Sequence, residues 1–175
     1  MGVAPFINAA ALAGFGVRYL AGPRQMHYLN HAFIPPLADI LGNNENGKQM
    51  AKEVYHYTRA LAIGLFEYLR LTGRKADNKS LETAWWIMAA NPIYDSFFDT
   101  VPIAAEQISR LEQILNGSPV SHEQPLEMAM RYALTQVQQR LNIRENDFLN
   151  RYLAAVHNAQ KAELEQIKLL IAEIS

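Results

Sequence analysis

Cysteine is absent from the 175 residues of this chain, which excludes disulfides, thiolate metal sites and cysteine nucleophiles. Charge of one sign is also lacking, because 16 basic and 17 acidic residues leave a net charge of −1. No run of Lys or Arg is longer than two residues. Since a duplex-binding protein normally carries a basic stripe, we expect no nucleic-acid partner. The absence of cysteine agrees with a cytoplasmic location, which we expect for this chain.

Strand patterns are missing as well. No alternation of apolar and polar residues bounded by hairpin turns occurs, whereas nearly every long segment shows helical periodicity. Half of the residues are hydrophobic, which is enough apolar surface for the core of one domain. The sequence therefore predicts a single all-α domain over residues 1–175, a bundle of about 6–8 helices joined by short loops.

The longest apolar stretch runs from Val3 to Val17 and is too short to span a bilayer, which takes roughly 20 residues. No Lys or Arg precedes it, and Pro5 and Asn8 interrupt it, so it departs from a signal peptide. We expect a buried or interface helix here. A peripheral membrane contact is the alternative.

Proline and glycine divide the first half of the chain. Pro35-Pro36 is expected to break a helix, and Gly42 to Gly47 reads as a loop. A long helix is predicted from about Lys48 to Leu71, with Gly73 just past its end.

Capping residues predict the later helices. Asp77 to Ser80 can cap a helix from Leu81 toward Asp99, in which Pro92 must introduce a kink or a restart. A helix after Pro102 is expected to end near Asn116-Gly117. The motif Asn142 to Glu145 fits a capping box, and the helix after it could run to Ile174.

Two carboxylates, Asp95 and Asp99, lie four residues apart. On a helix they share a face, where they repel each other unless a cation or a proton sits between them. Mg²⁺ prefers such oxygen ligands, so the pair is a candidate metal site. The alternative is structural: Asn91 caps a helix, Pro92 opens it, and the helix dipole then favours an acid in the first turn.

Large aromatic residues surround the acid pair. Phe97 and Phe98 lie between the two acids, and Trp85 and Trp86 lie two turns earlier. They could form the wall of an apolar cavity for a ligand with a diphosphate head and a hydrocarbon tail. Equally, they could simply fill the core of a bundle.

Other motifs are less specific. Glu53-x-x-His56 fits half of a di-iron site, but no second copy follows, so an exposed pair is the alternative. His27 and His31 have the spacing of zinc ligands without an obvious third ligand, which favours packing or capping roles. Arg59 could hold a phosphate oxygen, or form a salt bridge.

Residues 57–75 and 81–99 together resemble the class I isoprenoid biosynthesis enzymes, and more narrowly the bacterial group related to polyprenyl synthetases. The segment Asp95-Ser96-Phe97-Phe98-Asp99 matches the first and last acids of the family's Asp-Asp-x-x-Asp motif, with Ser96 at the middle position. The resemblance implies that Asp95 and Asp99 bind Mg²⁺, which grips a prenyl diphosphate, and that Phe97, Phe98, Trp85 and Trp86 are candidate wall residues of the cavity. Together with the phosphate contact suggested for Arg59, the expected substrate-binding residues are Arg59, Phe97, Phe98 and Trp86.

The resemblance covers the N-terminal half of such a fold, about residues 48–166. Asp147 is the only aspartate after Asp99, so the family's second aspartate-rich motif is missing, as are the paired arginines after the first. The chain is therefore expected to be a fragment of a prenyl transferase or terpene synthase-like enzyme, a subunit of one, or a relative that kept the helices and lost the reaction. A non-catalytic helical binding or assembly module is the alternative function. We expect a homo-oligomer or a second helical chain as partner.

Overall fold

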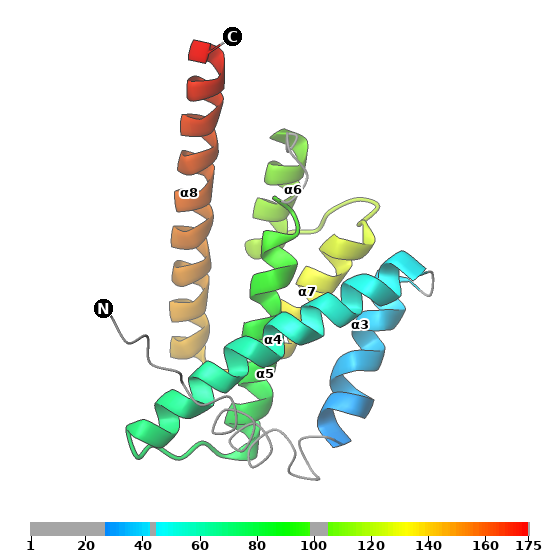
Figure 1. The fold of residues 1–175 in the computed structure, drawn as a ribbon, viewed down its shortest axis with the longest axis vertical. Coiled ribbons are helices and arrows are strands. Elements are labelled where there is room, and N and C mark those ends of the chain that lie inside the picture. The colour runs from blue at the N-terminus through cyan, green and yellow to red at the C-terminus, as the bar shows by residue number, and fades with distance from the viewer. Residues whose placement is uncertain (1–26, 43–44, 99–104, 175) are drawn as a thin grey trace, which may run out of the picture.

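The computed structural model describes residues 27–42, 45–98 and 105–174. Every regular element in these ranges is helical, which confirms the predicted all-α bundle. Figure 1 shows α4 crossing α5, with α8 as a long helix beside them whose C-terminal end extends beyond the bundle. The elements are η1 (Leu29–Phe33, a π-helix), α3 (Ile34–Leu41), α4 (Glu45–Leu71), α5 (Asn78–Asp95), α6 (Ala105–Leu115), α7 (Pro125–Gln138) and α8 (Ile143–Ile174).

Helix α5 is the centre of the bundle, and α4 and α7 pack against it. Its neighbouring residues Trp85 and Trp86 are both fully buried, which requires that other helices cover more than one face. The indole Nε1 of Trp86 donates a hydrogen bond to the Tyr28 hydroxyl at 2.6 Å. The Trp86 ring lies 4.6 Å from that of Phe33 and 5.3 Å from that of Tyr132, measured between centroids. The aromatic core therefore joins η1, α5 and α7.

The capping residues act as the sequence predicts. The Asp77 side chain accepts a hydrogen bond from the Ser80 amide at 2.7 Å, and Gly73 takes a positive φ of 66° just after α4. Asn142 and Glu145 form the predicted capping box, because each side chain accepts a hydrogen bond from the backbone amide of the other. These contacts are local and set where the helices begin and end.

Several predicted boundaries were wrong. Helix α5 begins at Asn78, three residues before the predicted Leu81. Pro35 and Pro36 do not break a helix; they lie in the first turn of α3, directly after the π-helical segment. That turn tolerates proline because its amides have no partner within the helix. The predicted loop from Gly42 to Gly47 is shorter, since α4 already begins at Glu45. A Cβ atom on Gly47 would collide with the carbonyl oxygens of Leu41 and Gly42, so glycine allows this close turn.

Pro92 neither restarts α5 nor opens a new helix. The helix continues through it to Asp95, and Pro92 itself is buried. Asn91 is therefore an interior residue of α5 rather than a cap, and Asp95 belongs to the last turn rather than the first. Asp99 and the stretch Val3 to Val17 lie outside the described residues. Within the described ranges, no helix combines the length and apolar character needed to cross a membrane.

Two methionines on α7 test this packing. Met130 is fully buried, whereas Met128 is 44% exposed. We expect Met130→Ala to lower the free energy of unfolding by about 2–5 kcal/mol, because it leaves a cavity in the core. Met128→Ala should change it by less than about 0.5 kcal/mol. Urea denaturation measures both; equal losses would contradict the described packing of α7.

Candidate binding groove and acidic hollow

An apolar groove of about 730 Å³ lies between α5, α7 and the N-terminal half of α8. This volume falls in the usual range for small-molecule sites, which is about 300–1,000 Å³. The residues that line it are mostly apolar: Ile87, Met88, Ala90, Asn91, Tyr94, Met130, Leu134, Leu141, Arg144, Glu145, Phe148, Leu149, Tyr152, Leu153 and Val156.

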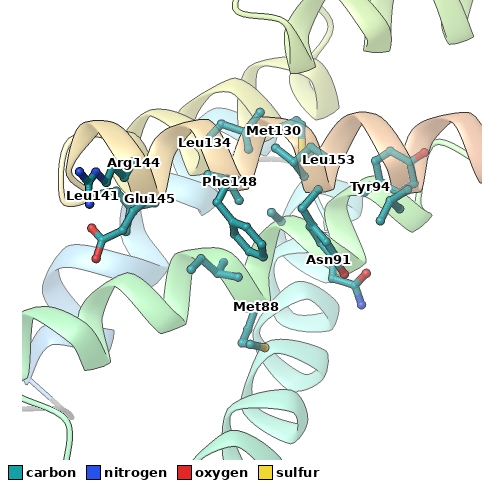
Figure 2. A pocket seen from close by; sticks show the side chains of 15 residues that line it. Met88, Asn91, Tyr94, Met130, Leu134, Leu141, Arg144, Glu145, Phe148 and Leu153 are labelled. Atoms are coloured by element: carbon teal, nitrogen blue, oxygen red, sulfur yellow. The ribbon is translucent and has the colours of Figure 1, made fainter.

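The polar residues of the groove gather toward its ends. Figure 2 shows the Phe148 ring in the space between α8 and α5, with Arg144 and Glu145 toward one end and Asn91 and Tyr94 toward the other. The middle of the groove is thus apolar. Such a surface favours an elongated hydrocarbon over a polar ligand.

The groove exists because α8 is attached to α5 beyond it. The Tyr94 hydroxyl and Nδ1 of His157 form a buried hydrogen bond of 3.1 Å. Burial raises the pKa of the Tyr94 hydroxyl to about 12, and the negative charge of Asp95 contributes to this rise. Burial also lowers the pKa of the His157 imidazole. Both groups are therefore neutral at pH 7, and a neutral pair costs less to bury than a charged one.

A second hollow, of about 460 Å³, lies between α4 and α5. It is lined by two acids, Glu53 and Asp95, together with Met50, Val54, Tyr57, Pro92 and Ser96. The acids come from different helices, so the fold brings together carboxylates that are distant in the sequence. Carboxylate oxygens are the ligands that Mg²⁺ prefers.

Asp95 is the last residue of α5. The C-terminal end of a helix carries partial negative charge, which disfavours a carboxylate and favours a cation. Asn91 lies one helical turn earlier, on the same face, and lines the apolar groove. The last turn of α5 therefore contributes side chains to both hollows.

The aromatic residues near the acids lie mainly in the core. Trp85 and Trp86 are fully buried, and Phe97 is 8% exposed. Phe98 is half-buried, with its ring 5.1 Å from that of Tyr94. None of these four side chains lines the apolar groove or the acidic hollow.

The remaining predicted ligands are spread over the surface. Arg59 and His56 are exposed on α4 and line neither hollow. The His27 and His31 rings lie 4.5 Å apart. In ranges 27–42, 45–98 and 105–174 no group of three or more His, Asp or Glu side chains is arranged to hold a metal. Asp99 is not part of those ranges.

Sequence reasoning missed the α8 wall of the groove. Phe148, Leu149, Tyr152, Leu153 and Val156 follow the 3–4-residue spacing of a helix face. That spacing was readable in the sequence, but it does not reveal that part of the face stays uncovered.

Comparisons of the chain with protein-family models, with curated proteins and with solved structures found no match. The residues of the groove and of the acidic hollow therefore carry the functional argument.

The Tyr94–His157 contact generates a pH prediction. The folded state lowers the pKa of His157, so folding favours the neutral imidazole. This preference contributes its whole stabilisation at pH values above the pKa of an unfolded histidine, about 6.5. This stability is lost as the pH falls through that value toward the lower folded pKa. We expect the urea midpoint to drop between about pH 7.5 and pH 5.5, and the drop to be smaller in His157→Gln. His56→Gln, at an exposed position, is the control; an identical pH profile in all three proteins would refute the role of His157.

Proposed function

We propose that this chain binds a prenyl diphosphate-like ligand together with Mg²⁺, as a class I isoprenoid synthase-like enzyme or as a fragment or subunit of one. The observation that supports this most is the place of Asp95. It lines an acidic hollow one helical turn from Asn91, at the end of an apolar groove. A ligand with a charged head and a hydrocarbon tail has the same arrangement, with a polar group at one end of an apolar length.

The tail would lie in the groove. Leu153 and Leu149 of α8 face this space together with Met88 of α5, and each buried CH₂ group contributes about 0.8 kcal/mol. A prenyl chain carries no hydrogen-bonding groups, so it needs none from the wall.

The head would lie toward the last turn of α5. Asp95 and Glu53 supply carboxylate oxygens, and the helix end favours a cation there. This donor set fits Mg²⁺, which commonly takes one or two carboxylates and completes its shell with phosphate oxygens and water. Asp99, predicted as the second ligand, lies outside the described residues. When bound, Mg²⁺ would neutralise the charge of the diphosphate.

One observation favours a second candidate, a non-catalytic helical binding module. The groove wall exposes large apolar side chains, with Phe148 68% and Tyr152 56% exposed. Exposed apolar surface of this kind marks an interaction site. In this alternative the groove binds an apolar partner, and the acids of the hollow bind no metal.

Calorimetry separates the two candidates. We expect farnesyl diphosphate to bind with Mg²⁺ and to lose at least about tenfold in affinity in Asp95→Asn, because a metal ligand is removed. Asp39→Asn, an exposed acid on α3, is the matched control and should leave the affinity unchanged. An affinity for farnesyl diphosphate that changes neither without Mg²⁺ nor in Asp95→Asn would rule out metal-assisted binding. The non-catalytic binding module would then remain.

The tail site has its own test. Leu153→Ser should weaken both farnesyl diphosphate and the uncharged alcohol farnesol by about tenfold or more, since it removes apolar contact. Leu164→Ser is the control, because Leu164 is also half-buried on α8 but does not line the groove. Equal losses of affinity in the two variants would show that the tail does not bind in the groove.

A further inference from the structure

An exposed face of α8 carries a regular stripe. Phe148, Tyr152, Ala155, Ala159 and Ala162 follow one another at intervals of four, three, four and three residues, and all five are exposed. This 4-3 spacing is the heptad pattern of a helix that packs along a second helix. On the opposite face, His157 and Lys161 bind Tyr94 of α5 and Glu112 of α6.

The size of the side chains changes along the stripe. Its N-terminal part holds two aromatic rings, and its C-terminal part holds three methyl groups. In an antiparallel pair of identical helices, Tyr152 can lie opposite Ala155 of the other copy, and Phe148 opposite Ala159. Each large side chain then meets a small one, which suits the filling of the space between the helices. A parallel pair would set ring against ring and methyl against methyl.

Charge agrees with the same register. Arg144 flanks the stripe, and the layers above place it beside Glu165 of the other copy on the same side of the contact; both side chains are exposed. A parallel pair would instead set Arg144 beside Leu149, which offers no opposite charge. The net charge of −1 does not oppose association of two copies.

A two-fold contact uses the same patch on both copies, so the patch must complement itself. The stripe of α8 has this property in both side-chain size and charge. A partner of different sequence would not require it.

We infer that the surface of α8 formed by Phe148, Tyr152, Ala155, Ala159 and Ala162 binds a second copy of this chain, with the two α8 helices antiparallel. Phe148 and Tyr152 also line the groove, so the partner helix covers its open side. The contact does not depend on the ligand of the groove or on the acids of the hollow.

Sedimentation velocity over a range of concentrations tests the association. The wild-type chain should form dimers, and Tyr152→Glu should raise the dimer dissociation constant by about 30-fold or more, as loss of a central aromatic side chain does at interfaces. Tyr68→Glu is the matched control, because Tyr68 is 52% exposed on α4, outside the stripe. A wild-type monomer throughout the micromolar range, or equal effects of the two variants, would overturn the proposal.

Cross-linking tests the direction of the helices, and the absence of native cysteine makes single-cysteine variants specific. In the antiparallel register, two copies of residue 155 lie about 4.5 Å apart along the helix axis, and two copies of residue 162 about 25 Å apart. A short bifunctional maleimide should therefore join Ala155→Cys chains efficiently and Ala162→Cys chains poorly. Efficient joining of Ala162→Cys chains, or failure of Ala155→Cys chains, would overturn this register.

Discussion

The burial of α5 between α4 and α7 is the constraint on which the rest of the structure depends. Trp85 and Trp86 are adjacent and both fully buried, so neighbouring helices must cover more than one side of α5. With its middle fixed in this way, the C-terminal half of α5 faces the two hollows. Asn91 and Tyr94 then line the apolar groove, and Pro92 and Asp95 line the acidic hollow. The proposed ligand site is thus a consequence of core packing.

Helix α8 completes the groove with few contacts to the bundle. Leu149, Leu153 and Leu164 pack against the core. Its polar attachments are the neutral Tyr94–His157 pair and the half-exposed ion pair between Lys161 and Glu112. An ion pair at such a position adds little stability. The groove is therefore built on a helix that leaves apolar surface uncovered, which suits a protein that gains a ligand or a partner there. Binding to the folded state would also raise its apparent stability.

Features set by local hydrogen bonds could be predicted from the sequence. The caps at Asp77 and Asn142 and the turn at Gly73 depend on residues within one helical turn, and the structure confirms them. Pro35-Pro36 was misread because proline can either end a helix or begin one. The groove and the pairing of Glu53 with Asp95 in one hollow could not be predicted, because periodicity shows which residues share a face but not what that face meets.

The central claim is that the last turn of α5 holds the metal-bound head of a ligand whose tail lies along α8. Amide NMR spectra with farnesyl diphosphate and Mn²⁺ in place of Mg²⁺ test it most directly, since a paramagnetic ion broadens the signals nearest to it. The account predicts broadening around Asp95 and Glu53, and ligand-induced shifts from Phe148 to Val156. Broadening centred away from the end of α5, with no shifts in α8, would contradict it.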